Sequence, residues 1–184
     1  MTTLLGRVQA QNETWLYKLP TGRVRGVVFP TSPTALPTSV FVLPRLGLRT
    51  RPAEPIKAGD LLRDPFRRTL LVGDHDGSLS GDARVSKLFA LFQMTGQVSW
   101  QRRGQETKHP VTGLKMAEGA LVELGPIWVS IESYTHGNED PGVRVPTDRL
   151  RCITHARLQL GDVVNGKTVK RINPALGVII AEIE

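Results

Sequence analysis

The densest group of residues with metal-binding or acid–base chemistry is Asp74-His75-Asp76, followed by Gly77 and Asp82. Carboxylates two residues apart can face one divalent cation, so this segment is a candidate metal loop. The pattern departs from the calcium loop of EF-hands, because its glycine comes too early. A polar turn, in which aspartate side chains accept hydrogen bonds from nearby backbone, explains the same residues. We therefore predict a turn here rather than a metal site.

The other nucleophilic and basic side chains form no recognised catalytic pattern. The single cysteine, Cys152, lies in a strand-like run, where cysteine acts as a small hydrophobic residue. Nucleophile-elbow and dinucleotide motifs are absent from the sequence, and the phosphate-loop spacing of Gly161, Gly166, Lys167 and Thr168 lies in a β-hairpin pattern rather than ahead of a helix. No ligand pair at metal-binding spacing occurs among the histidines, which are His75, His109, His136 and His155. We therefore predict a protein that is not an enzyme and that holds neither a metal nor another cofactor.

Basic residues are concentrated near the start of the sequence. The chain has a formal net charge of +7 over 184 residues. Residues 1–51 contain seven basic residues and one acidic residue, a balance of +6, whereas the other 133 contain 17 basic and 16 acidic residues, a balance of +1. Such asymmetry is typical of proteins that meet a polyanion. The candidate contacts to DNA or another polyanion are Arg23, Arg25, Arg49 and Arg51.

Tryptophan is the side chain best suited to stack on nucleic-acid bases. Trp15, Trp100 and Trp128 each lie within a strand-like run, and aromatic residues make up only 5% of the chain. A stacking platform needs several aromatic side chains on one surface. We therefore predict that the tryptophans pack in a core or at a subunit interface.

The fold class follows from the distribution of proline, glycine and β-branched residues. Thirteen prolines and eighteen glycines divide the chain into short apolar runs, few of which keep a helical period. Near the C-terminal end, Asn165-Gly166 lies between β-branched residues, which is a strong hairpin signal. We predict a mostly β fold, a small barrel or sandwich with an SH3-like C-terminal part and at most one short helix. No internal repeat is visible in the sequence.

Three other segments carry predictions of local structure. Residues 14–29 predict a hairpin that turns at Pro20-Thr21-Gly22. Residues 83–94 fit a helix by the spacing of their apolar side chains, but they also alternate as a strand would, and both alternatives stay open. Residues 120–124 and 127–133 predict two strands separated by Gly125-Pro126.

A proline-rich stretch follows the basic hairpin. Residues 30–57 contain six prolines, so they form either a linker or an arm that lies on a neighbouring subunit. We divide the chain into residues 1–57, a basic N-terminal hairpin with a Pro-rich extended arm, and residues 58–184, a β-rich domain that ends in barrel-like hairpins. The predicted residues of the inter-subunit arm are Pro30, Pro33, Pro37, Val40, Phe41 and Val42.

Apolar runs in the chain are short. None approaches the roughly 20 residues of a transmembrane helix, and the first residues contain no apolar core of a secretion signal. We therefore expect no membrane association and synthesis in the cytoplasm.

The C-terminal segment, residues 156–184, resembles the closing β-hairpins of neck proteins of tailed bacteriophages. These are the head–tail connector and head-closure proteins. The shared features are a Gly-Asp turn, a glycine-containing hairpin and a final strand that begins with Gly-Val. In this chain they correspond to Gly161-Asp162, Asn165-Gly166, Val169, Ile172 and Gly177-Val178.

This resemblance implies a virion structural protein of the phage head–tail junction, a connector or head-closure protein made in the host cytoplasm. Such a protein assembles as a homo-oligomeric ring around the DNA channel. It joins the portal or adaptor to tail proteins of the same virion and touches packaged DNA non-specifically.

Three alternatives remain. One is another phage structural component, either a tail or baseplate protein or a capsid decoration protein. Another is a non-specific nucleic-acid-binding β-barrel module, which the net charge favours. The last is a hydrolase or metal-dependent enzyme built on Asp74, His75, Asp76 and Asp82.

Overall fold

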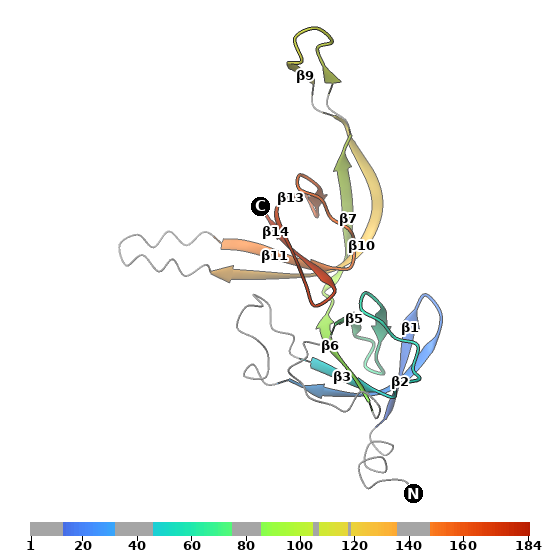
Figure 1. Cartoon of the computed structure of the whole chain (residues 1–184). Coiled ribbons are helices and arrows are strands. Elements are labelled where there is room, and N and C mark those ends of the chain that lie inside the picture. The colour runs from blue at the N-terminus through green and yellow to red at the C-terminus, as the bar shows by residue number, and fades with distance from the viewer. Residues whose placement is uncertain (1–12, 32–45, 75–85, 105–106, 118, 136–147) are drawn as a thin grey trace, which may run out of the picture. The chain divides into compact units, whose positions relative to one another are not determined.

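The computed structural model describes residues 13–31, 46–74, 86–104, 107–117, 119–135 and 148–184 (Figure 1). Within these ranges the chain forms fourteen β-strands and no helix, which confirms the predicted mostly β fold. Two six-stranded closed barrels account for twelve of the strands, so the barrel is correct and the sandwich is not. No described segment is an apolar helix long enough to cross a membrane.

The first barrel has the strand order β1-β2-β3-β6-β5-β4 around its wall. Its strands are β1 (Thr14–Leu19), β2 (Arg23–Pro30), β3 (Leu46–Thr50), β4 (Leu61–Arg63), β5 (Thr69–Gly73) and β6 (Lys87–Gln93). Side chains alternate between interior and surface, so Leu16 is fully buried while Trp15 and Tyr17 face outward. The core is aliphatic and consists of Leu16, Val24, Leu48, Ile56, Leu62, Leu70, Val72 and Leu91.

The second barrel has the order β7-β10-β11-β14-β13-β12 and closes between β12 and β7. Its strands are β7 (Gly96–Arg103), β10 (Leu121–Thr135), β11 (Asp148–Thr154), β12 (Val163–Val164), β13 (Lys167–Ala175) and β14 (Val178–Ile183). Its core consists of Ile127, Val129, Cys152, Ala156, Leu158, Val164, Val169, Ala181 and Ile183. Each barrel therefore has a hydrophobic core of its own.

Both barrels have the same connectivity. In the order around the wall, β7 takes the place of β1, and β10 to β14 take the places of β2 to β6. The strand registers correspond, so that Leu48 of β3 and Cys152 of β11 occupy equivalent positions, and both are fully buried. The two barrels therefore repeat one fold, although the sequence shows no matching repeat.

A Gly-Asp turn leads into the fourth strand of each barrel. The two glycines have φ angles of 87° and 86°, in the left-handed region that favours glycine. In the first barrel, Asp60 Oδ2 accepts from the backbone N–H of Lys57 at 2.9 Å. In the second, Asp162 Oδ2 accepts from the backbone N–H of Gln159 at 2.8 Å. The same carboxylate-to-backbone bond therefore fixes the fourth strand in both barrels.

The chain divides at a different place from the predicted one. One compact unit contains residues 1–94 and 174–178, and the other contains residues 95–173 and 179–184. The predicted boundary after residue 57 falls inside the first barrel, because β4 pairs with β1 and is needed to close the wall. The change in composition at this point is therefore not a domain boundary.

Two predicted segments take a more definite form. Residues 87–93 form β6, which pairs with both β3 and β5, so the strand alternative for 83–94 is correct where that segment is described. Residues 121–135 form the single strand β10, which corrects the prediction of two strands. Gly125, with a φ of 103°, lies at a bulge that bends this strand without ending it.

The predicted hairpin turns are confirmed. Pro20-Thr21-Gly22 connects β1 to β2, and the backbone N–H of Lys18 donates to the carbonyl oxygen of Gly22 at 3.0 Å. Asn165 and Gly166, with φ angles of 52° and 75°, form the two-residue turn between β12 and β13.

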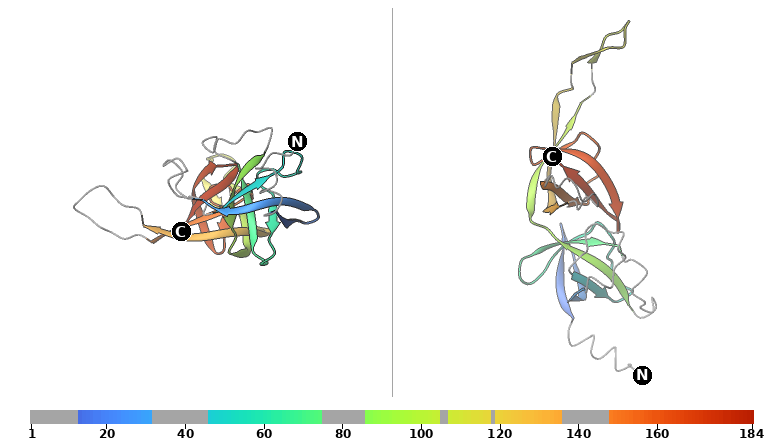
Figure 2. Two further views of the ribbon diagram at one scale, coloured as in Figure 1. Left: turned by 90° about the horizontal axis from the view of Figure 1, so that it is seen from below. Right: turned by 90° about the vertical axis from the view of Figure 1, so that its left-hand side faces the viewer.

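A long hairpin leaves the second barrel between β7 and β10, where the first barrel has its short Pro20–Gly22 turn. Figures 1 and 2 show β7 and β10 running side by side past the wall of this barrel. At the tip, β8 (Thr107–Lys108) and β9 (Lys115–Ala117) form a two-stranded sheet. We call residues 103–124 the long hairpin.

Candidate functional site

Arginine and aromatic side chains share the outer face of the first barrel. Trp15 and Tyr17 of β1 are 46% and 50% exposed. Arg23 and Arg25 of β2 are exposed on either side of a buried valine. Arg63 of β4 is exposed as well and lies opposite Tyr17 in the ladder between β4 and β1. We call these five residues the Arg–aromatic face.

The strand register places an arginine beside each ring of this face. Trp15 lies opposite Arg25, and Tyr17 lies opposite Arg23. The guanidinium carbon of Arg25 is 4.5 Å from the centroid of the Trp15 ring, and that of Arg23 is 5.7 Å from the Tyr17 centroid. A guanidinium over a ring is held by the ring's quadrupole while its N–H edge stays available to an anion.

The arginines of this face form no ion pair with any carboxylate in the described part of the chain. Glu54 lies beside one end of the face, since its Oε2 accepts from the backbone N–H of Arg25 at 2.9 Å. One carboxylate offsets only part of the charge of three guanidinium groups. The face therefore presents uncompensated positive charge.

The other two predicted DNA contacts differ in their surroundings. Arg49 of β3 is exposed, and its guanidinium carbon lies 6.0 Å from the centroid of the Phe29 ring. Arg51 forms two hydrogen bonds to the carboxylate of Glu13, from Nε at 2.9 Å and from Nη2 at 2.7 Å. The hydrogen bond that Arg51 donates to the Glu13 carboxylate raises the pKa of Arg51. Arg51 is thus already balanced by a carboxylate, whereas Arg49 forms no ion pair with a carboxylate in the ranges that the structure describes.

The predicted inter-subunit arm lies almost wholly outside the described residues. Pro30 ends β2 in an exposed position. The other predicted arm residues lie outside the described ranges: Pro33, Pro37, Val40, Phe41 and Val42.

The candidate metal loop is also mostly outside the described ranges. Asp74 is described, whereas His75, Asp76 and Asp82 are not. Among the described residues no cluster of potential metal ligands occurs. The turn at this segment stays a prediction.

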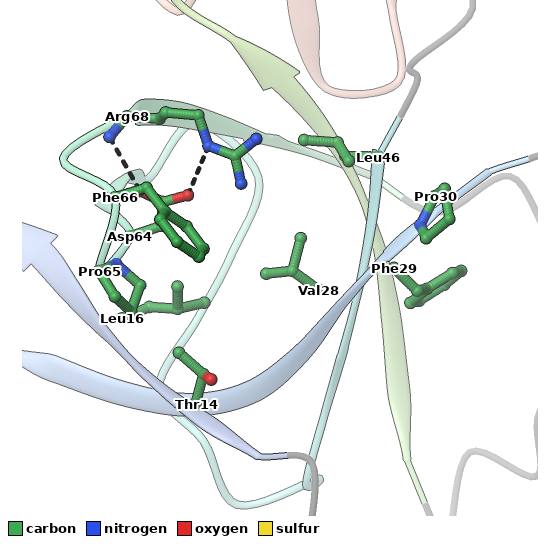
Figure 3. A pocket seen from close by; sticks show the side chains of 10 residues that line it. All are labelled: Thr14, Leu16, Val28, Phe29, Pro30, Leu46, Asp64, Pro65, Phe66 and Arg68. Carbon is green, nitrogen blue, oxygen red and sulfur yellow. Dashed lines mark hydrogen bonds and ion pairs between the residues drawn. The ribbon is translucent and has the colours of Figure 1, made fainter.

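A pocket of about 390 Å³ opens on the first barrel (Figure 3). Its charged side chains are paired, since Arg68 Nε donates to Asp64 Oδ2 at 2.7 Å. Arg68 also lies over the Phe66 ring, which is 79% exposed. The remaining lining is largely apolar: Thr14, Leu16, Val28, Phe29, Pro30, Leu46 and Pro65. The pocket suits an apolar group and offers no unpaired acid or base for catalysis.

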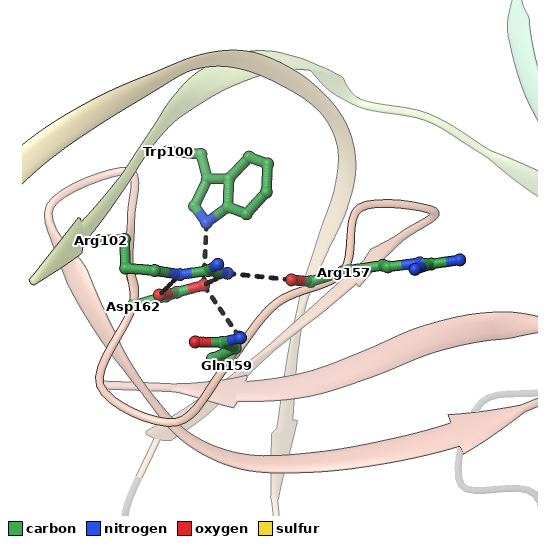
Figure 4. Close-up of polar contacts among 5 residues, drawn as sticks. All are labelled: Trp100, Arg102, Arg157, Gln159 and Asp162. Atoms are coloured by element: carbon green, nitrogen blue, oxygen red, sulfur yellow. Dashed lines mark hydrogen bonds and ion pairs between the residues drawn. The ribbon is translucent and has the colours of Figure 1, made fainter.

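In the second barrel, the polar side chains around the turn residue Asp162 form a cluster that stabilises the fold. Asp162 is nearly fully buried and accepts from Trp100 Nε1 at 2.9 Å and from Arg102 Nε and Nη2 at 2.8 and 2.9 Å (Figure 4). Arg102 Nη2 also donates to the carbonyl oxygen of Arg157 at 3.0 Å. Burial alone would raise the pKa of Asp162, but these hydrogen bonds and that from Gln159 lower it overall. The cluster ties β7 to the Gly-Asp turn and leaves no group free for a substrate.

Large apolar side chains are exposed along the long hairpin. Val111 and Leu114 at the tip are 87% and 69% exposed. The tip turn is ordered by His109, whose Nδ1 accepts from the backbone N–H groups of Val111 and Thr112 at 3.3 and 3.2 Å. Apolar side chains on β10 are about half exposed as well, namely Leu121, Val122 and Leu124. The long hairpin therefore carries apolar surface that its own barrel does not cover.

The tryptophans do not share one environment. Trp100 packs against the core of the second barrel, as predicted. Trp15 lies on the Arg–aromatic face, so the core alternative is wrong for this residue because it points outward from β1. The interface alternative for Trp15 stays a prediction.

Tyr17 and Arg63 are members of the face that the sequence-based reasoning missed. The predicted hairpin at Pro20–Gly22 already brings the strand of Tyr17 beside that of Arg23, and the observed register sets Tyr17 opposite Arg23. Arg63 has no such local signal, since it reaches the face through the pairing of β4 with β1.

Comparison of the chain with protein-family models, with curated proteins and with solved structures finds no match.

Proposed function

We propose that this chain is a virion structural protein of a phage head–tail junction, a connector or head-closure subunit that assembles as a ring around the DNA channel. The observation that carries the proposal is the long hairpin with its exposed apolar side chains. Five large exposed apolar side chains lie on this one hairpin, and apolar side chains gathered on a protein surface mark interaction sites. The C-terminal resemblance supplies the place of assembly, between portal and tail.

The closed barrels strengthen the argument for assembly through the hairpin. Closure leaves no free strand edge, so a neighbouring chain cannot join either barrel by adding a strand. A projecting hairpin that contacts a different surface of the next subunit makes a head-to-tail interface. Such interfaces close into rings when the rotation between subunits permits.

The experiment compares the oligomeric mass of the full chain with that of a chain without the hairpin tip. In the shortened variant, residues 104–120 are replaced by Asn-Gly, which joins Arg103 to Leu121, its partner in the ladder. A second variant, Val111→Ser with Leu114→Ser, keeps the hairpin and removes its apolar tip. The full chain is expected to form a ring by native mass spectrometry, and both variants are expected to stay monomeric.

The matched control is Leu160→Ser. Leu160 is also a highly exposed apolar residue of the second barrel, but it lies outside the long hairpin. This variant is expected to assemble as the full chain does. A full chain that stays monomeric and binds neither portal nor tail proteins would overturn the proposal. Co-purification with tail, baseplate or capsid proteins alone would move it to one of the other phage structural roles.

A further inference from the structure

We infer that the Arg–aromatic face of the first barrel binds the sugar–phosphate backbone of duplex DNA without reading its sequence. This inference deepens the proposed function by naming the DNA-facing surface, and it rests on that function for packaged DNA as the natural source of the duplex. The surface itself is argued from the barrel alone.

The charge of the Arg–aromatic face complements that of DNA. Arg23 and Arg63 flank Tyr17 on adjacent strands, and no described carboxylate pairs with either arginine. Arg25 extends the row along β2. Unpaired guanidinium groups gathered on one wall attract a polyanion and release its counterions on contact.

The second barrel shows that the fold does not require this charge. Counting from the Gly-Asp turn, Ser99 takes the place of Tyr17 and Pro126 takes the place of Arg23. Asn165 takes the place of Arg63. The same wall is therefore uncharged at these positions in one barrel and basic in the other. Because the fold does not require arginine at these positions, the basic residues of the first barrel point to a ligand.

The ring contacts suit the arginines to phosphate. A guanidinium that stacks on a ring loses fewer rotamers when it binds, because its plane is already fixed. Its N–H groups lie in that plane and match two phosphate oxygens at once. Arg25 over Trp15 at 4.5 Å and Arg23 beside Tyr17 at 5.7 Å have this arrangement.

The same contacts favour duplex DNA over single strands. A single strand is held largely by bases that stack on open aromatic faces. Here guanidinium groups lie over the rings of Trp15 and Tyr17, so one face of each ring is already in use. A duplex keeps its bases inside and offers phosphates, which are the groups that these arginines can reach.

The test measures binding of a 20-base-pair duplex to the hairpin-shortened variant by fluorescence anisotropy from 20 to 200 mM salt. This variant is expected to stay monomeric, so its DNA binding does not depend on ring assembly. A chain that does not assemble and a face that does not bind DNA therefore give different results. The double variant Arg23→Gln with Arg63→Gln is expected to bind roughly tenfold more weakly and to lower the salt slope by about two.

The matched control removes two positive charges from the second barrel. Lys170 and Arg171 are exposed on β13, and Lys170→Gln with Arg171→Gln changes the net charge by the same amount. This control is expected to bind the duplex within about twofold of its parent. Trp15→Leu with Tyr17→Leu keeps every arginine and is expected to bind with intermediate affinity, because the guanidinium groups lose their support.

Three results would overturn the inference. The first is an absence of duplex binding even at 20 mM salt. The second is an equal loss of affinity in the Arg23/Arg63 and Lys170/Arg171 variants, which would reduce the effect to net charge. The third is tighter binding of a single-stranded oligonucleotide that Trp15→Leu abolishes, which would make the face a base-stacking platform instead.

Discussion

The two barrels share a connectivity and differ in what their walls carry. In both, a Gly-Asp turn fixes the fourth strand, and the aspartate also accepts a side-chain bond from the first strand. Lys18 Nζ reaches Asp60 at 2.7 Å, and at the equivalent position Trp100 Nε1 reaches Asp162 at 2.9 Å. The donor has changed while the acceptor and its role have not. The Gly-Asp turn and its bond to the first strand are therefore features that both barrels share.

The outer wall and the hairpin between the first two strands are the parts that vary. The first barrel has a three-residue turn and a basic, aromatic wall. The second has the long hairpin with its exposed apolar tip and an uncharged wall at the equivalent positions. In the proposals above, the first barrel binds a polyanion and the second makes the protein contacts. The comparison of the two barrels can be tested by changing equivalent residues in pairs.

The largest difference is expected at the centre of the two cores. Leu48 and Cys152 are equivalent and fully buried, but leucine fills more space. Leu48→Ala is expected to lower the free energy of unfolding by about 3 kcal/mol, and Cys152→Ala by about 1 kcal/mol. Urea titrations of both variants measure this. Equal losses would show that the two positions are not packed equivalently.

The two turn aspartates should differ next. Asp162→Asn weakens bonds to Trp100 and Arg102 at a nearly fully buried site, so a loss of about 2 kcal/mol is expected. Asp60→Asn weakens its bond to Lys18, which is partly exposed, and a loss of about 1 kcal/mol is expected. A larger loss for Asp60→Asn would break the proposed ranking of the two turns.

The effect of Asp162 should depend on pH. Its pKa is lower in the folded chain than in the unfolded chain, despite burial that would raise it, because of its hydrogen bonds from Arg102, Trp100 and Gln159. The stabilisation is therefore fully present above the unfolded pKa of about 3.9 and is lost as the pH falls through the folded pKa. Unfolding free energies of wild type and Asp162→Asn should converge below about pH 4. A difference that stays constant down to pH 2.5 would contradict this origin.

The smallest expected effects concern two equivalent threonines. Both Thr50 and Thr154 are fully buried. Thr154 Oγ1 donates to the carbonyl oxygen of Trp128 at 2.8 Å, whereas Thr50 Oγ1 has no hydrogen-bond partner among the described residues.

Valine at these positions should therefore act in opposite directions. Thr154→Val is expected to destabilise by about 1–2 kcal/mol, and Thr50→Val to be neutral or to stabilise by up to about 1 kcal/mol. Thermal unfolding of the two variants under one buffer makes the comparison. Equal destabilisation would mean that Thr50 has a partner after all.

Local signals in the sequence predicted much of the local structure. The turn at Pro20–Gly22 and the Asn165-Gly166 hairpin were predictable because their backbone conformations favour particular residues. The repetition of the barrel was not predictable in this way. It depends on which strands pair, and equivalent positions such as Lys18 and Trp100 share no chemistry beyond an N–H donor.

The candidate site was predictable in part for the same reason. Arg23 and Arg25 follow from charge alone, and Tyr17 from the hairpin register. Arg63 joins them only through pairing between β1 and β4, which are separated by about forty residues of sequence. The predicted break at Gly125-Pro126 was wrong, because the strand continues through a bulge there, and the length of the hairpin follows from that continuity.

The most direct test of assembly is the mass of the full chain in solution over a wide range of concentration. Analytical ultracentrifugation of the chain, by itself and mixed with portal protein, makes this measurement. Assembly through the long hairpin predicts one ring-sized species many times heavier than the 20.2 kDa chain. A chain that sediments as a 20.2 kDa monomer at every concentration, with portal protein present or absent, would contradict it.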